Sequence, residues 1–132
     1  LVGLLAIAAA IKYTIGKNAY GYSGLGDISV FVFFGVVGVI GSSYLFNLTI
    51  ELVIILPAIS IGVFSVGVLN LNNLRDIDND AKHGKNTLAV KFGRSWAKNY
   101  HYALITTGWL LFVLFLYFFL HLLVLLIQYI YL

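Results

Sequence analysis

The stretch LVIILPAISIGVFSVGVLNL, residues 52–71, decides the fold of this chain because it contains no Asp, Glu, Lys or Arg. An α-helix rises about 1.5 Å per residue, so about 20 apolar residues are needed to cross a hydrocarbon core of ~30 Å. Pro57 lies inside the stretch, where neighbouring helices or water can satisfy the carbonyl that a proline leaves without a donor. Residues 52–71 are therefore predicted to form a transmembrane helix.

Further uncharged stretches lie on both sides of this helix. Residues 28–46 predict a second full span. The uncharged stretch 99–132 is too long for one crossing, so we expect a third full span over 100–120 and the start of another over 122–132. Residues 1–11 cover only about half a bilayer and predict a partial span. The expected fold is all-α, a polytopic transmembrane helix bundle with three full spans and two partial ones in a single membrane domain, residues 1–132.

The composition agrees with a membrane protein. Of the 132 residues, 61% are hydrophobic and 10% are charged, whereas soluble domains average roughly 45–50% apolar and about 25% charged. This excludes a soluble globular domain, a disordered chain and a nucleic-acid-binding protein. Cysteine is absent, which excludes disulfides, thiolate metal sites and a cysteine nucleophile. Because methionine is also absent and Leu1 opens inside an apolar run, we expect the chain to be a fragment.

The basic residues predict how the helices are oriented. The short turn at 47–51 carries one acidic residue, Glu51, and no basic one. The segments 12–27 and 72–98 hold all the basic residues, namely Lys12, Lys17, Arg75, Lys82, Lys85, Lys91, Arg94 and Lys98. Because Lys and Arg in short loops mark the cytoplasmic side, both segments are predicted to be cytoplasmic loops. The turn near Glu51 then faces the other side of the membrane.

Other residues in and beside the spans suggest structural roles. Glycines recur in two of the predicted spans and would let helix backbones approach closely; they are Gly35, Gly38, Gly41, Gly62 and Gly67. Asp27 stands directly before the span 28–46 and predicts a helix N-cap. Tyr100 and Trp96 lie near a span end, as interfacial aromatic anchors do.

An acidic cluster lies at the end of the span 52–71, in the run NNLRDIDND, residues 72–80. If the helix continues through this run at about 100° per residue, then Asn73, Asp76 and Asp80 fall within roughly 60° of one another. Asp78 then points about 160° away from Asp80. Acidic residues at membrane level are costly and usually functional. The spacing therefore predicts one face with two carboxylates and an amide.

This face has two interpretations. Carboxylate and amide oxygens are hard ligands that suit Mg²⁺ or Mn²⁺, and Mg²⁺ bound by one or two carboxylates keeps positions open for substrate phosphates. The cations that follow, Lys82, Lys85, Lys91 and Arg94, would neutralise those phosphates. Alternatively, the segment is a solvated loop whose charges balance and set the topology. Residue spacing leaves both interpretations open.

Several motifs resemble a known family. The run 72–80, continued by the tail GKNTLA at 84–89, resembles the second aspartate-rich motif of the UbiA superfamily of intramembrane prenyltransferases. The run YGYSGLGD at 20–27, followed by FFG at 33–35, is similar to an earlier loop and helix of that family. Tyr13 and Lys17 match its Tyr-x-x-x-Lys pattern, and the tail most resembles the branch that prenylates 1,4-dihydroxy-2-naphthoate.

The resemblance implies a function and a set of site residues. It implies Mg²⁺-dependent transfer from a polyprenyl diphosphate to 1,4-dihydroxy-2-naphthoate, with loss of diphosphate and CO₂, in a multi-pass protein of the cell inner membrane. Asp76 and Asp80 would be catalytic through the metal, with Asn73 as the amide ligand. Substrate binding would fall to Tyr13, Lys17, Asn72 and Lys85.

The resemblance also implies that something is missing. The family binds Mg²⁺ and diphosphate between two aspartate-rich motifs, and nothing resembling the first occurs in this chain, where Asp27 and Glu51 are the acidic residues upstream of Asp76. We therefore expect N-terminal helices carrying that motif to be absent, and the fragment alone to be inactive.

Two alternatives remain at this level. The chain is consistent with a UbiA-type enzyme that uses another aromatic acceptor. It could also be a non-enzymatic subunit, either structural or for transport. Transport predicts ionisable residues near a span midplane, and the predicted spans contain no Asp, Glu, Lys or Arg. A purely structural subunit leaves the three aspartates without a role.

Overall fold

The computed structural model describes residues 2–14, 21 and 24–130, and all regular structure in these residues is helical. The helices are α1 (Val2–Thr14), α2 (Gly26–Val30), η2 (Phe31–Gly41), α3 (Ser42–Asn47), η3 (Leu52–Ile54), α4 (Ile55–Arg75), α5 (Ile77–Lys82) and α6 (Leu88–Ile130). Helices α2, η2 and α3 follow one another without a gap, as do η3 and α4.

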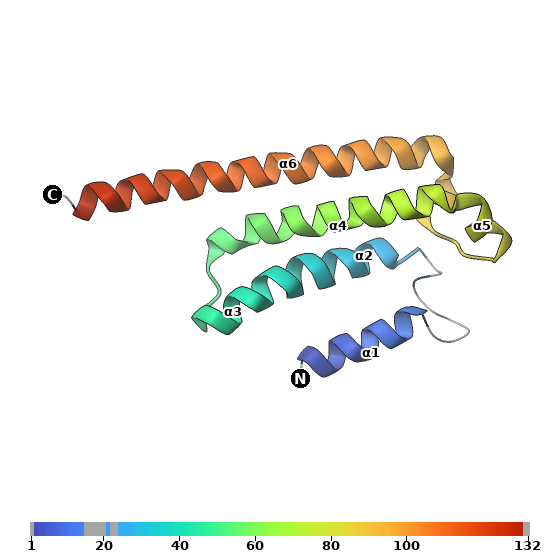
Figure 1. Cartoon of the computed structure of the whole chain (residues 1–132), viewed down its shortest axis with the longest axis horizontal. Coiled ribbons are helices and arrows are strands. Elements are labelled where there is room, and N and C mark those ends of the chain that lie inside the picture. The colour runs from blue at the N-terminus through green and yellow to red at the C-terminus, as the bar shows by residue number, and fades with distance from the viewer. Residues whose placement is uncertain (1, 15–20, 22–23, 131–132) are drawn as a thin grey trace.

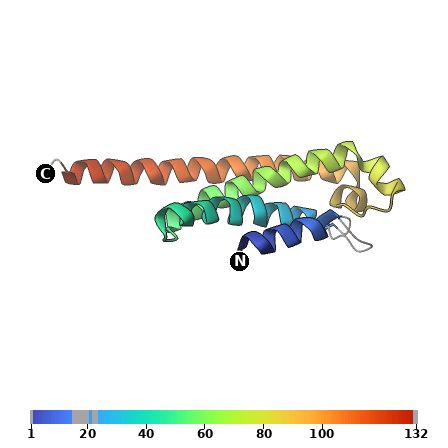
Figure 2. The same cartoon turned by 60° about the horizontal axis from the view of Figure 1, so that its bottom comes forward.

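The helices lie side by side, and successive long helices run in opposite directions (Figure 1). Helix α4 is central, with η2 on one side and α6 on the other, and these are its most extensive contacts. The view in Figure 2 keeps α4 between the same neighbours, with α1 beside α2 and η2. The end of α1, the start of α2, the end of α4 and α5 all lie at one end of the bundle. That end carries the polar segments.

Three helices are long and apolar enough to cross a membrane: Gly26–Asn47, Leu52–Arg75 and Leu88–Ile130. A shorter apolar helix covers Gly3–Tyr13. The prediction of an all-α helical membrane bundle is confirmed.

Helix α6 differs from the sequence-based expectation. We predicted one span ending near residue 120 and another starting at 122, but α6 (Leu88–Ile130) continues through residues 120–122 without interruption. No proline or glycine follows Gly108, so nothing in the sequence ends the helix there. Its one non-helical residue is Gly93, with φ 85° and ψ 168°. Gly93 kinks the helix, and the continuous part after the kink, residues 94–130, is roughly 55 Å long at 1.5 Å per residue, nearly twice the thickness of a hydrocarbon core.

A second difference lies within the first long span. Residues Phe31–Gly41 form a π-helix, with α-helical turns before and after it. The pattern of apolar residues does not distinguish the two geometries, because both keep every backbone group bonded within the helix. The turn that follows begins at Leu48, which is in the left-handed region with φ 56°.

Small residues hold the helices close together. A Cβ atom built on Gly35 would lie 2.6 Å from the carbonyl oxygen of Ala58 and 2.8 Å from the Cα of Gly62. Only glycine permits this approach of η2 and α4. Two side chains also bond to the backbone of α6: Ser60 Oγ donates to the carbonyl of Gly108 at 2.8 Å, and Asn70 Nδ2 donates to that of Ala97 at 2.8 Å. Both donors are buried, so α4 and α6 are joined by packing and by hydrogen bonds.

Candidate functional site

The acidic segment folds as a helix with one interruption, at Asp76. Helix α4 ends at Arg75, and α5 begins at Ile77. Asp76 has φ −96° and ψ 10°, so the continuous helix that we assumed is broken there. The spacing of one turn is nevertheless kept, because the Asp80 N–H donates to the Asp76 carbonyl at 2.8 Å. Asp76 and Asp80 are therefore one turn apart across the junction of α4 and α5.

The three aspartates of the motif have different surroundings. The Asp80 side chain is 5% exposed, that of Asp76 is 42% exposed and that of Asp78 is 85% exposed. Asp78 therefore faces solvent while Asp80 is turned inward, in agreement with the predicted opposition of these two side chains. Each carboxylate has a cationic partner: Asp76 pairs with Arg75 at 2.9 Å, Asp78 with Arg94 at 3.2 Å and Asp80 with Lys85 at 3.0 Å.

Local cations act on the ionisation of Asp76. The Arg75 guanidinium donates to both Asp76 oxygens at 2.9 Å. These hydrogen bonds lower the pKa of the Asp76 carboxyl below its usual value, and the charges of Arg75 and Lys85 act in the same direction. Lys85 thus influences Asp76 while its ammonium group contacts Asp80. Its backbone N–H also donates to the Asp80 carbonyl at 2.9 Å.

Apolar cavities lie beside this polar end. One of about 340 Å³ lies between α1 and the α2–η2 helix and is lined by Ala6, Ala10, Tyr13, Ser29, Val30, Phe33 and Phe34. A second of about 300 Å³ is lined by Val30, Phe34, Ser65, Val68, Leu69 and Asn72. Val30 and Phe34 border both. The second cavity adjoins the acidic motif, because Asn72 accepts the backbone hydrogen bond of Asp76 at 3.0 Å.

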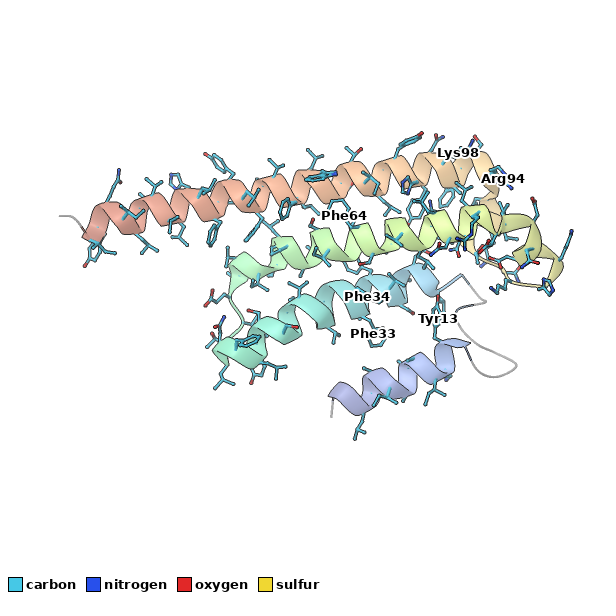
Figure 3. All side chains as sticks on the ribbon, viewed as in Figure 1. Tyr13, Phe33, Phe34, Phe64, Arg94 and Lys98 are labelled. Atoms are coloured by element: carbon cyan, nitrogen blue, oxygen red, sulfur yellow. The ribbon has the colours of Figure 1, made fainter. Side chains whose placement is uncertain are left out.

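The other residues singled out from the sequence are placed as follows. Tyr13 lies at the end of α1 and points toward the start of α2 (Figure 3), where a Cβ atom on Gly26 would lie 3.2 Å from its hydroxyl. Asn73 is half-buried and Asn72 is exposed. Lys17 lies outside the described residues, so the structure does not relate it to the motif.

One polar contact was not foreseen. The N-cap role predicted for Asp27 is wrong, because Asp27 lies inside α2 and the start of that helix has no side-chain cap. Its buried carboxylate instead accepts a hydrogen bond from the Tyr100 hydroxyl at 3.0 Å. Tyr100 stacks on Trp96 with ring centroids 4.8 Å apart. The only sequence signal was an acidic residue at the start of an apolar span.

The side chains around Asp76 and Asp80 can be compared with the ligands that a magnesium ion needs. Within the ranges that the structure describes, no group of three or more His, Cys, Asp or Glu residues could hold a metal. Two carboxylates with a nearby amide are too few for an all-protein cage. They do match a Mg²⁺ ion that binds one or two carboxylates and takes its other ligands from water and substrate phosphates. Arg75 and Lys85 supply positive charge at the same place.

The whole chain, residues 1–132, matches the model of the UbiA prenyltransferase family. The chain belongs to that family.

Several proteins that share one name are similar in sequence to most of this chain. The chain is 54% identical over 114 residues to a 1,4-dihydroxy-2-naphthoate octaprenyltransferase of Haemophilus influenzae, covering 86% of this chain and 37% of that protein. It is 50% identical over 121 residues to the protein of the same name from Escherichia coli, covering 92% and 39%. The Mycobacterium tuberculosis protein of that name is 44% identical over 116 residues, covering 87% and 40%. The chain thus spans about two fifths of the length of these relatives. No solved structure matches it.

Proposed function

We propose that the protein containing this chain transfers a polyprenyl group from a polyprenyl diphosphate to 1,4-dihydroxy-2-naphthoate, in menaquinone biosynthesis. The bond between the allylic carbon and the diphosphate oxygen breaks, and its electron pair leaves with the diphosphate. The ring carbon that carries the carboxylate forms the new carbon–carbon bond. The carboxylate then leaves as CO₂, and its bonding electrons restore the aromatic ring.

The observation that carries this proposal is the meeting of two environments at one end of the bundle. Asp76 and Asp80 lie one helical turn apart, with Arg75 and Lys85 bound to them. One of the apolar cavities is lined at one end by Asn72, which lies one helical turn before Asp76. An amphipathic substrate with a diphosphate head and a prenyl tail needs this combination. The proposed acceptor, 1,4-dihydroxy-2-naphthoate, is taken from the names of the relatives.

Each residue has a role in this scheme. Asp76 and Asp80, with Asn73, would hold Mg²⁺, which neutralises charge on the departing diphosphate when it is bound. Lys85 and Lys17 would contact the diphosphate oxygens, and Asn72 would bind the head group at the mouth of the cavity. Tyr13 lines the other cavity, where its ring would orient the prenyl chain and stabilise the allylic cation.

We further propose that the protein spans the cell inner membrane with its aspartate-rich segment in the cytoplasm. The support is the distribution of Lys and Arg, none of which lies in the turn at 47–51. We also propose that the segment acts together with a first aspartate-rich motif elsewhere in the protein, and that the 132-residue chain alone is inactive. Two carboxylates are an incomplete site for Mg²⁺ and diphosphate.

The test is a membrane assay of the complete protein with Mg²⁺, a polyprenyl diphosphate and naphthoate labelled in its carboxyl group. Prenylated quinol and labelled CO₂ are expected in equal amounts, and both should be lost when Mg²⁺ is chelated. A parallel reaction with 4-hydroxybenzoate examines the alternative acceptor. Product from the benzoate alone would replace the proposed acceptor, and no product with either would reject prenyl transfer.

A further inference from the structure

Arg94 bridges the two helices that flank Asp76. Its Nη1 donates to the carbonyl of Leu74 at 3.2 Å, and its Nη2 donates to Asp78 Oδ2 at 3.2 Å. Leu74 is in the last turn of α4, and Asp78 is in the first turn of α5. One guanidinium thus contacts the chain two residues before Asp76 and two residues after it. The Leu74 carbonyl belongs to the last turn of a helix, where carbonyls lack intrahelical donors and favour a cation.

An apolar contact supports the same junction. Ile77 is buried with Ala89 and Ala97 of α6, and Leu74 and Val90 pack against this group. The residues beside Asp76 are therefore held by α6 through both apolar packing and Arg94. The carboxylate of Asp76 itself pairs with its neighbour Arg75, which does not fix it relative to another helix.

The backbone of α6 is shaped for this contact. Gly93, directly before Arg94, has φ 85° and ψ 168°, a conformation that is essentially restricted to glycine. The kink lies between Ala89 and Ala97, which are both fully buried. Arg94 lies at the end of α6 beside α5, and Lys98 lies one turn further along the helix (Figure 3).

We propose that Arg94 is a positioning residue that sets the angle between α4 and α5, and thereby holds the carboxylates of Asp76 and Asp80 in place to bind one metal ion. The inference rests on the proposed function, because it concerns the same carboxylates. It assigns a role to Asp78 as an anchor for Arg94 rather than as a ligand. Arginine suits this task because its planar fork carries two separated donors, whereas lysine has one ammonium group.

The test measures binding of Mn²⁺ to the complete protein in detergent, by the loss of the free-ion paramagnetic resonance signal and without substrate. Arg94→Gln is expected to weaken Mn²⁺ binding about tenfold, the size of effect seen when groups that orient metal ligands are removed. Arg94→Lys keeps the charge but cannot bridge both acceptors, so most of the loss should remain. The Mg²⁺ concentration for half-maximal activity should rise in parallel.

Lys98→Gln is the matched control. It removes one positive charge from the same end of α6, and Lys98 has no hydrogen bond or ion pair to any residue described in the structure. Its Mn²⁺ affinity should equal that of the unmodified protein. The folded fraction of every variant, measured by size-exclusion chromatography, separates a lost site from a lost fold.

Three outcomes would overturn the inference. The first is unchanged Mn²⁺ binding in Arg94→Gln, and the second is full recovery in Arg94→Lys. The third is a loss of Mn²⁺ binding in Arg94→Gln that is seen only when inorganic diphosphate is added. That result would indicate that Arg94 binds the diphosphate instead of positioning the metal ligands. If Arg94→Gln weakens Mn²⁺ binding but the unmodified protein prenylates no aromatic acceptor, the inference stands and the proposed function is rejected.

Discussion

Asp78 and Asp80 are two residues apart, yet one is almost fully exposed and the other is almost fully buried. We expect Asp80→Asn and Asp76→Asn to lower kcat on the order of 100-fold or more, because each removes a carboxylate from the proposed metal site. Asp78→Asn should stay within about threefold, because its amide oxygen can still accept the hydrogen bond from Arg94. Product formation in membranes with Mg²⁺ measures all three. Equal activities would contradict the assignment of Asp76 and Asp80.

The hydrogen bonds from Arg75 give Asp76 a pH dependence of known sign. Because they lower the pKa of this carboxyl, Asp76 stays ionised to a lower pH than a free aspartate, and metal binding needs the ionised form. Arg75→Gln should raise the pKa of Asp76 and move the acidic limit of Mn²⁺ binding to higher pH. Carboxyl carbon NMR across pH 2–6 measures the pKa directly. An acidic limit that does not move would show that another group controls it.

Helix packing depends on the contact between Gly35 of η2 and Gly62 of α4. The Cβ atom of Gly35→Ala would meet backbone atoms at 2.6 and 2.8 Å, and backbone cannot move aside as a side-chain end can. We expect a loss of about 1–3 kcal/mol of stability, as in other overpacked contacts. Gly41→Ala is the control, because its nearest neighbour would be Val37 Cγ1 at 4.0 Å. Thermal unfolding in detergent should separate the two variants.

Structural features that depend on neighbouring residues could be predicted from the sequence, whereas contacts between residues far apart in the sequence could not. The span 52–71 follows from an uninterrupted apolar run, and the structure starts that span at Leu52. The break in the helix at Asp76 could not be predicted from the sequence, because the residues around it suit a continuous helix. The bond between Asp27 and Tyr100 joins residues 73 positions apart, so only the packing of α2 and α6 against α4 brings them together. The opposition of Asp78 and Asp80 was predictable because it needs only helical geometry.

For the whole molecule, the orientation in the membrane is the next prediction to measure. This segment contains no cysteine, so single cysteines introduced into it can report which side each turn faces once any cysteines elsewhere in the complete protein are replaced. Thr49→Cys, in the turn at 47–51, should react with a membrane-impermeant maleimide in intact cells whose outer barrier is permeabilised. Lys82→Cys, exposed at the end of α5, should react only after the inner membrane is broken. The reverse pattern would invert the proposed orientation and place the acidic motif outside.

The bonds from Ser60 and Asn70 to α6 have a consequence for the order of assembly. A ribosome makes α4 before α6, so both polar side chains of α4 are synthesised before the carbonyls of Gly108 and Ala97 that accept their hydrogen bonds. Until then they lie in a nascent helix with no partner from α6, where an unpaired polar group in lipid is costly. The arrival of α6 removes this cost. Pairing of α4 with α6 therefore follows the synthesis of α6, and these two hydrogen bonds contribute to its driving force.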